Sequence, residues 1–331
     1  MQFTIGMIGQ SLYPGSQKLW WEDISSDEIV QMVQRADELG FDMVRIGEHV
    51  VMHEDWVDVM GPRWVDCVST LAFVAGATKQ IKVISGIIVL PYHNPVELAK
   101  ALATIDYLSD GRLVFTAALG YMEWEYELLK VPFAERGAIM DEYLDVIVEL
   151  WTSDKPKFDG KYVQFDNIVF DPKPRQKPRP PIWLGGHSKA SARRVARVGE
   201  GWMPWGITRG QLPGMLDYIR SSPGYAERPR ELDVFMTLFE GEIDPATHAV
   251  LAPPKVVMNK DAILEQIHAL AAIGVTTTDA DPILGWGEYG IEGGEDLPAI
   301  RSTEEYLERL QWFAEEILPE GHQIVPAPTL S

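Results

Sequence analysis

The sequence has very little cysteine and a shortage of positive charge. Cys67 is the only cysteine in 331 residues, which excludes an intrachain disulfide and a cysteine-rich zinc site. Lysine and arginine number 29 against 49 acidic residues, so the formal net charge is −20. A surface this acidic repels phosphate backbones and anionic lipids. We therefore expect no nucleic-acid partner and no membrane partner.

Targeting and membrane-spanning patterns are also missing. The first residues, MQFTIGMIG, lack a basic stretch and are typical of a strand rather than of a signal peptide. No run of about 18 apolar residues occurs, as a membrane-spanning helix would need. Hydrophobic residues still make up 46% of the chain, enough for a large core. We expect a soluble cytoplasmic enzyme.

Several motifs of well-known enzymes are absent. No G-x-G-x-x-G follows the first predicted strand and no P-loop occurs, which argues against a nucleotide-binding open sheet. No G-x-S-x-G elbow is present, and Cys67 lies on an apolar helical face, where packing is the simpler role. These absences disfavour nucleophilic hydrolase chemistry.

The sequence does contain a repeated alternation of short apolar runs and helical periodicity. Ser25 and Glu28 form a capping box before a helix that Gly40 is placed to end, and Asn94 with Pro95 begins another. Strands are predicted at 3–9, 43–47, 81–90, 112–119, 182–184, 201–203, 232–238 and 275–278. Predicted helices include 63–77, 137–151, 188–198, 211–220, 260–273 and 303–317.

Strand–helix units repeated in this way can close into a barrel that has no exposed strand edge. We predict a single (β/α)8 TIM barrel over 1–331, with a hairpin insertion near 157–170 and a lengthened region near 240–258. A doubly wound open sheet is the alternative. In such a barrel, reactive residues lie at the carboxyl ends of the strands and in the loops that follow.

Aromatic residues follow most of the predicted strands. Flat apolar side chains at one mouth of a barrel suit a planar conjugated cofactor and an apolar small-molecule substrate. The alternative is that several of them pack beneath loops. The candidate substrate-binding residues are Tyr13, Trp20, Trp56, Trp124, Trp205 and Trp286.

The segment Gly185-Gly186-His187-Ser188 joins a predicted strand to a helix. Two glycines and a serine N-cap leave backbone amides and the helix dipole facing outward, which predicts a phosphate cradle. An ordinary tight turn before a solvated basic helix is the alternative. The cradle would follow the fifth strand, whereas phosphate sites in such barrels more often follow strands seven and eight. Basic residues of the helix add positive charge nearby: Lys189, Arg193, Arg194 and Arg197.

Glu48 and His49 come directly after the second predicted strand. An imidazole there could hydrogen-bond a cofactor ring or a substrate oxygen and exchange a proton near neutral pH. A structural histidine is the alternative. A metal site using His49, His53, Glu54 and Asp55, as in a metal-dependent hydrolase or lyase, lacks the H-E-x-x-H spacing, so we predict no metal.

Four stretches of the chain carry a family resemblance. They are RADELGFDMVRIGEHV (35–50), ISGIIVLPYHNPVELAKALATIDYLSDGRL (84–113), VPFAERGAIMDEYLDVIVELW (131–151) and PIWLGGHSKASARRVARVGEGW (181–202). Together they resemble the luciferase-like monooxygenase superfamily, most of all its branch of coenzyme F420-dependent oxidoreductases. The match is weak from Gln211 onward, the half that usually sets substrate choice.

The resemblance implies roles for particular residues around a flavin-like ring. The bulge Ser85-Gly86-Ile87 would back the ring, and some members of the family carry a non-prolyl cis peptide bond there. His49 matches the histidine of an acid–histidine pair near the reactive edge of the ring. Gly185, Gly186 and Ser188 match the loop that holds the cofactor phosphate.

The end of the fourth strand departs from the family pattern. Relatives often have a glycine-richer run where this chain has 117–121, which includes the candidate cofactor contact Ala118. Some reductases carry a glutamate proton donor where Tyr121 stands here. The resemblance therefore leaves the acid role to Tyr121 or to a substitute, Glu123 or Glu125.

The leading functional hypothesis is hydride transfer between reduced coenzyme F420 and an apolar enone, ketone or alcohol. The alternative within the family is a two-component monooxygenase that uses reduced FMN and oxygen and depends on a partner flavin reductase. A cofactor-free binding protein on the same barrel is a further alternative, which the intact 185–188 loop opposes. We expect a homodimer.

Overall fold

The computed structural model describes residues 1–11, 20–227, 230–243, 250–252, 256, 258–284 and 300–328. Within them a parallel sheet follows the order β10-β9-β8-β5-β3-β2-β1-β13, and a parallel bridge from Phe235 to Thr277 joins its two ends. The sheet is thus a barrel, which confirms the predicted fold and excludes the open sheet. The strands are β1 (Gln2–Gly6), β2 (Met43–Ile46), β3 (Lys82–Ser85), β4 (Ile88–Val89), β5 (Leu113–Ala118), β8 (Ile182–Gly185), β9 (Gly201–Met203), β10 (Asp233–Val234) and β13 (Thr277–Asp279).

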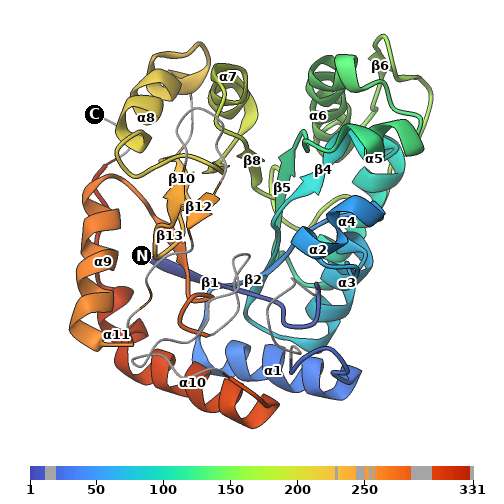
Figure 1. Ribbon diagram of the computed structural model, residues 1–331. Helices are drawn as coiled ribbons and strands as arrows, with labels where there is room; N and C mark the ends of the chain where they lie inside the picture. Colours follow the sequence, from blue (N-terminus) through green and yellow to red (C-terminus); the bar gives the residue numbers. More distant parts are fainter. Residues whose placement is uncertain are drawn as a thin grey trace.

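Helices surround the strands on the outside (Figure 1). The main ones are α1 (Ser26–Leu39), α3 (Cys67–Ala77), α4 (Pro95–Leu108), α6 (Arg136–Thr152), α7 (Lys189–Val198), α8 (Leu212–Ser221), α9 (Lys260–Ala272) and α10 (Thr303–Glu316). Shorter helices are α2 (Val57–Met60), α5 (Glu123–Leu128) and α11 (Leu318–Gly321), with 3-10 turns at Glu54–Trp56, Leu90–Tyr92, Phe133–Glu135 and Tyr225–Glu227. No helix within the described ranges is long and apolar enough to cross a bilayer.

The predicted helix signals act locally as expected. The Ser25–Glu28 capping box is present, Gly40 ends α1 with φ 85°, and the Asn94 side chain accepts from the amides of Val96 and Glu97. The predicted start of the 63–77 helix is wrong, because the Asp66 side chain caps α3 by accepting from the amide of Ser69.

Several predicted strands are shorter than expected, among them 3–9, which is β1 from Gln2 to Gly6, and two others differ most. The 81–90 run divides into β3 and β4, which flank a cis peptide bond between Gly86 and Ile87, so the non-prolyl cis bond that the family resemblance suggested is present. The 232–238 run retains only β10 and the bridge at Phe235. In both places the apolar pattern marks the right segment but not its ends.

Two insertions leave the regular repeat. The predicted hairpin is present as β6 (Phe158–Asp159) paired antiparallel with β7 (Gln164–Phe165). The Glu142 carboxylate of α6 anchors it by accepting from the amides of Lys161, Tyr162 and Val163. In the region near 240–258, β11 (Glu242–Ile243) pairs antiparallel with β12 (Val250–Ala252).

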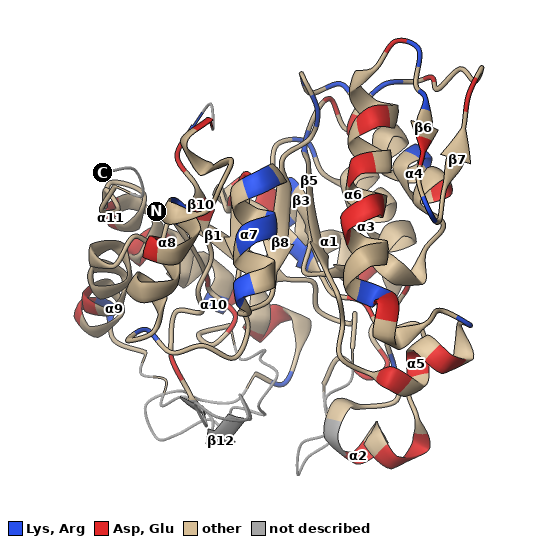
Figure 2. Cartoon of the chain, turned by 90° about the horizontal axis from the view of Figure 1, so that it is seen from above, with Lys and Arg blue, Asp and Glu red and all other residues tan. Residues whose placement is uncertain are grey.

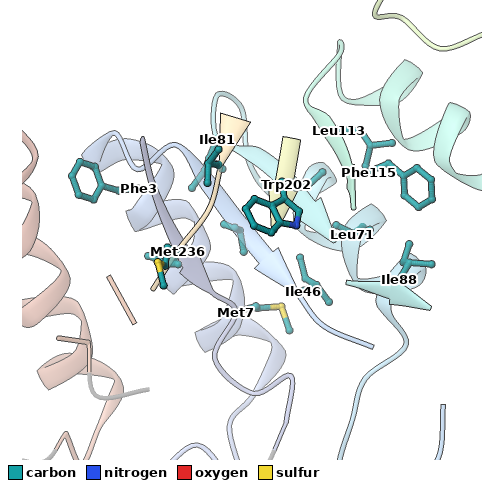
Figure 3. Close-up of a cluster of buried hydrophobic side chains, with 14 of the residues drawn as sticks. Phe3, Met7, Ile46, Leu71, Ile81, Ile88, Leu113, Phe115, Trp202 and Met236 are labelled. Carbon is teal, nitrogen blue, oxygen red and sulfur yellow. The ribbon is translucent and has the colours of Figure 1, made fainter. Parts of the chain in front are cut away.

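Side chains alternate between the two faces of each strand and form two cores. The larger core fills the space between the strands and the helices; Phe3, Ile46, Phe115 and Trp202 are among its members (Figure 3). The smaller core fills the inside of the barrel and consists of Met43, Ile84, Val114, Trp183, Met203 and Phe235. This apolar plug closes the barrel below its mouth, so any ligand would sit above it.

Candidate active site

Glu48 lies at the barrel mouth, and both oxygens of its carboxylate have hydrogen-bond partners. Its Oε2 accepts from the amide of Val89, at 2.6 Å, and its Oε1 lies 2.9 Å from Nε2 of His93. Burial lowers the pKa of His93, but the hydrogen bond and charge of Glu48 outweigh it, so that pKa lies above its ordinary value. Glu48 therefore joins the end of β2 to β4 and to the start of α4.

His49 belongs to a second, separate pair. Its Nδ1 lies 3.2 Å from Oε2 of Glu125, a carboxylate that is 1% exposed. Glu125 also accepts from the amide of Val50, at 3.0 Å, and from the hydroxyl of Tyr92, at 3.1 Å. With donors on both oxygens, this carboxylate favours the His49 tautomer that carries its proton on Nδ1.

The two glutamates of α5 that could supply the acid group differ in their burial. Glu123 is exposed in the first turn, whereas Glu125 is buried against His49. Burial and the nearby Glu125 raise the pKa of Tyr92, so its hydroxyl stays protonated and donates. Sequence reasoning counts Tyr92 among the aromatics that follow the third strand but does not pair it with Glu125, because local spacing carries no signal for a contact across 33 residues.

Aromatic rings connect His49 to the far side of the mouth. Its ring lies 4.5 Å from that of Trp64 and 6.3 Å from that of Tyr121, between centroids. Tyr121 stacks on Trp205 at 6.2 Å with 11° between the planes. Both stacked rings are about half exposed, at 56% and 48%. They form an open apolar wall that a substrate could contact.

The bulge between β3 and β4 is built around glycine. The Ser85 hydroxyl accepts from the amide of Thr116 at 2.7 Å and donates to its carbonyl at 3.0 Å, so this side chain ties β3 to β5. A Cβ on Gly86 would lie 2.2 Å from Cγ of Arg45, and only glycine leaves room for that stem. Ile87 packs on the smaller core.

Small residues also bring the ends of β5 and β8 together. A Cβ on Gly185 would lie 2.8 Å from Cβ of Ala118 and 3.6 Å from Cγ2 of Ile87. Three candidate cofactor contacts predicted from separate parts of the sequence therefore lie beside one another. Two of them, Ala118 and Gly185, contribute no more than a single side-chain carbon to this surface.

The predicted phosphate loop follows β8, the fifth strand position, as counted from the sequence. Gly186 has φ 96°, which favours glycine. Ser188 is the N-cap of α7, its hydroxyl accepting from the amide of Ser191 at 3.1 Å. His187 is held by a hydrogen bond between its Nδ1 and the carbonyl of Trp205, at 2.7 Å.

Two of the four basic residues predicted to add positive charge beside this loop are paired with acids, whereas Lys189 and Arg193 contact Tyr218. Arg194 pairs with Asp141 at 2.6 Å, Arg197 pairs with Asp145, and both acids belong to α6. Blue residues of α7 and red residues of α6 are visible in Figure 2. A phosphate at the loop would therefore depend on backbone amides and the helix dipole more than on these arginines.

The remaining aromatic candidates differ in their surroundings. Trp124 lies 5.5 Å from the ring of His53, and Trp56 is exposed in the turn before α2. Figure 2 shows α2 and α5 at the same end of the molecule. Trp20 packs on Trp21 and Tyr306. This agrees with the alternative that some of these aromatics have a packing role. Tyr13 and Trp286 lie outside the described residues.

Among the described residues, no group of three or more His, Cys, Asp or Glu side chains is arranged to hold a metal ion. His53 turns to the amide and carboxylate of Asp55 instead, at 3.2 and 3.5 Å.

Curated relatives match the chain over part of its length. An FMNH2-dependent dimethylsulfone monooxygenase of Pseudomonas putida is 28% identical over 179 residues, which is 53% of this chain and 49% of the relative. The oxygenase component of a flavin-dependent trigonelline monooxygenase of Acinetobacter baylyi is 31% identical over 168 residues, or 50% and 44% of the two chains. The chain thus spans about half the length of these relatives.

Solved structures share the fold over nearly the whole chain. Monooxygenase RslO1 from Streptomyces bottropensis has a TM-score of 0.73 and 22% identity, covering 97% of this chain and 99% of the other. The coenzyme F420-dependent tetrahydromethanopterin reductase of Methanopyrus kandleri has a TM-score of 0.66 and 15% identity, covering 96% and 99%. At these identities the likeness concerns the fold alone.

A family model decides the classification. The model described as luciferase-like monooxygenase matches residues 3–308, which is most of the chain and, apart from Gln2, includes every described strand of the barrel. The resemblance inferred from the sequence is confirmed: this chain belongs to the luciferase-like monooxygenase family.

Proposed function

We propose that this protein is the oxygenase of a two-component flavin-dependent monooxygenase. It would take reduced FMN from a separate flavin reductase and oxidise an apolar small molecule. The observation that carries the proposal is the His49–Glu125 pair, which holds an imidazole at the barrel mouth next to an open aromatic wall. The names of the two curated relatives, both flavin-dependent monooxygenases, favour FMN over coenzyme F420.

The residues present fit a flavin. Ala118 and Gly185 offer a surface of small residues beside Ile87, on which a planar ring could lie. Beneath it, the buried Oγ1 of Thr116 and Nε1 of Trp183 have no hydrogen-bond partner among the described residues. Polar atoms of this kind usually bind a ligand or water. The ring would be held by the bulge 85–87, and its phosphate by Gly186, His187 and Ser188.

His49 has the central chemical role in this proposal. When bound, reduced flavin supplies two electrons and reacts with oxygen. Glu125 fixes Nδ1 of His49, which leaves Nε2 to hold or deliver a proton. Tyr121 and Trp205 would position an apolar substrate and exclude water, with Trp124 and Trp56 at the edge of the mouth.

Hydride transfer from reduced coenzyme F420 is the competing hypothesis, and the same surface could hold its ring. The two cofactors differ at the fifth ring position, where nitrogen permits reaction with oxygen and carbon largely prevents it. Anaerobic fluorescence titration with each reduced cofactor, followed by oxygen-electrode measurements, separates the two. We expect tight binding of reduced FMN and oxygen consumption. Binding of F420 alone would overturn the proposal, and binding of neither would favour a cofactor-free binding protein.

The assembly can be tested in the same preparations. A homodimer stays a prediction, and sedimentation equilibrium of the purified protein checks it. Dependence on a partner is tested by replacing the flavin reductase with chemically reduced FMN. If the protein needs only the reduced ring, turnover should persist without the reductase.

A further inference from the structure

Two loops at the barrel mouth carry several of its aromatic rings and contact each other. They are 47–66, which follows β2, and 119–135, which follows β5. The rings of His53 and Trp124, one from each loop, lie 5.5 Å apart between centroids. The helices α2 and α5, which belong to these loops, lie at the same end of the molecule (Figure 2). The two loops therefore form one side of the mouth.

This side of the mouth is strongly acidic. The two loops together contain nine Asp and Glu residues against one arginine and one lysine. Five of the acids pair with a histidine or a lysine or cap α3; these are Glu48, Asp55, Asp66, Glu125 and Glu135. The other four are exposed and have no basic partner among the described residues; these are Glu54, Asp58, Glu123 and Glu127. We call the two loops together the acidic rim.

The other side of the mouth has the opposite composition. The loop 186–188 and the helix α7 contain four basic residues and no acidic one, although two of the four pair with acids of α6. Figure 2 shows this difference, with blue residues on α7 and red residues on α5. The proposed phosphate site is on the α7 side. The mouth thus offers different places to a negative and to a positive group.

Half-exposed aromatic rings lie at the same mouth as the acidic rim. Tyr121 belongs to the rim and stacks on Trp205, which follows β9. Trp56, also of the rim, is 41% exposed, and it and Trp205 are the only tryptophans more than a third exposed among the described residues. The face of an aromatic ring carries partial negative charge and attracts ammonium groups. Carboxylates nearby favour a cation further and repel an anion.

We propose that the substrate of this site is an organic cation with an apolar body, such as an aryl or alkyl ammonium ion, that binds with its charge on the Tyr121–Trp205 wall, facing the acidic rim. This inference rests on the proposed function, because it names the class of molecule that the flavin-dependent site would oxidise. The four exposed carboxylates would act at a distance, by raising the local concentration of cations. The rings would make the contact, and the apolar body would displace water from them.

Two probes of the same shape separate charge from hydrophobic contact. Phenyltrimethylammonium carries its charge on a nitrogen, and tert-butylbenzene has a carbon in the same place. Each is titrated into the purified protein without flavin, and saturation-transfer NMR of the nine-proton methyl signal gives the Kd. We expect the cation to bind about 5- to 30-fold more tightly than the neutral probe. Raising the salt from about 20 mM to about 500 mM should weaken only the cation, by several-fold.

Trp205→Leu tests the aromatic contact. Leucine keeps an apolar side chain at this position but has no ring to attract the charge. The Kd of phenyltrimethylammonium should rise by at least about fivefold, and that of tert-butylbenzene should change less. Thermal melting verifies the fold of the variant, and the comparison of the two probes on the unaltered protein needs no variant at all.

A double substitution tests the acidic rim. Glu123→Gln with Glu127→Gln removes two exposed charges one turn apart on α5 while keeping the size of the side chains. The Kd of the cation should rise by about two- to fourfold at low salt and be unaffected at high salt. The matched control is Glu304→Gln with Glu308→Gln, which removes two exposed charges with the same spacing on α10, outside the barrel. This control should bind both probes like the unaltered protein.

The outcomes distinguish this inference from the proposed function. If reduced FMN does not bind, the proposed function fails whatever the probes do. If reduced FMN binds but tert-butylbenzene binds as tightly as the cation, or salt leaves the affinity for the cation unchanged, the substrate class alone is overturned. Undiminished binding of the cation by Trp205→Leu would overturn it too, as would equal weakening in the α5 and α10 double variants.

Discussion

Glu48 and His49 are adjacent in the chain, yet they enter two different histidine–carboxylate pairs. Glu48 pairs with His93 and binds the amide of Val89, so every partner of its carboxylate belongs to the segment that links β4 to α4. His49 pairs with Glu125 from α5, and its ring faces Trp64 and Tyr121 at the mouth. The chemistry of the two pairs is the same, but their surroundings differ.

The comparison shows what distinguishes a reactive pair from a structural one. Both carboxylates are buried and accept from a backbone amide, so neither burial nor backbone support separates the two pairs. The difference lies in the histidines: the ring of His49 lies beside the aromatic wall, so under the proposed function the group that can exchange a proton faces the substrate side. Four substitutions test this difference, from the largest effect to the smallest.

The largest effect is expected from His49→Ala. Removing a group that transfers protons in the reaction should lower turnover by about two to four orders of magnitude. Oxygen consumption at saturating reduced FMN measures it, and thermal melting verifies the fold. His93→Ala is the matched control: turnover per folded molecule should change little, and a loss as large as that of His49→Ala would erase the distinction between the pairs.

Glu125→Gln should have the next largest effect, because it removes the charge that fixes His49 while keeping the size of the side chain and one of its two acceptor oxygens. We expect turnover to fall by about 10- to 100-fold, as when the outer partner of a functional histidine is lost. The pH profile of turnover should shift as well, which a purely structural role would not cause.

Glu48→Gln is the control for that experiment, since the amide oxygen can still accept from the amide of Val89. Its turnover and pH profile should stay close to those of the unaltered protein. An unchanged profile for Glu125→Gln, or a shifted one for Glu48→Gln, would reverse the assignment of the two pairs.

His93→Gln tests the structural pair through stability. A raised pKa means that the folded protein holds the His93 proton more tightly than the unfolded chain does. The stabilisation is therefore fully present below the ordinary value of 6.5 and is lost as the pH rises through the folded pKa. A charge-assisted hydrogen bond contributes about 1.5–3 kcal/mol. The loss of stability in the variant, measured by urea unfolding, should be largest near pH 5.5 and should shrink toward pH 9.

A constant difference in the free energy of unfolding across that pH range would mean that His93 contributes by packing alone.

His322→Gln gives the comparison with an exposed pair, because His322 lies 3.0 Å from Asp42 at the surface. Exposed pairs contribute little, so the free energy of unfolding of that variant should change by less than about 1 kcal/mol.

The sequence predicts the barrel well because its strands are short apolar runs that alternate with helical segments, even where the pattern does not mark the ends of a strand. The 185–188 turn is found in the same way, since glycines and a serine cap are local signals. The helix α5 is not, because EWEYEL carries no apolar stripe. Without that helix, Glu125 could be proposed as an acid but could not be assigned to His49.

Contacts between distant segments set the limit of the sequence analysis. Trp20 follows the first strand as the mouth aromatics follow theirs, but it packs on Tyr306, which α10 brings to the same place. The Arg45–Asp281 contact spans 236 residues and has no local periodicity to reveal it. The order of strands and helices can be predicted from one sequence, whereas partners fixed by closure of the barrel cannot.

Tyr92→Phe should give the smallest effect of the four substitutions. It sharpens the comparison of the two pairs most, because Tyr92 precedes His93 in the chain but donates to Glu125, the partner of His49. The variant removes one of the hydrogen bonds to a carboxylate that keeps its bonds from Val50 and His49. A cost of about 0.5–1.5 kcal/mol in stability follows from one lost hydrogen bond, with a decrease in turnover of a few-fold. Tyr162→Phe, which removes a hydroxyl that donates to Glu135 at the hairpin, is the control for stability and should leave turnover unchanged. If Tyr92→Phe lowers turnover as strongly as His49→Ala, then the proton comes from the tyrosine hydroxyl, and His49 only positions the carboxylate between them.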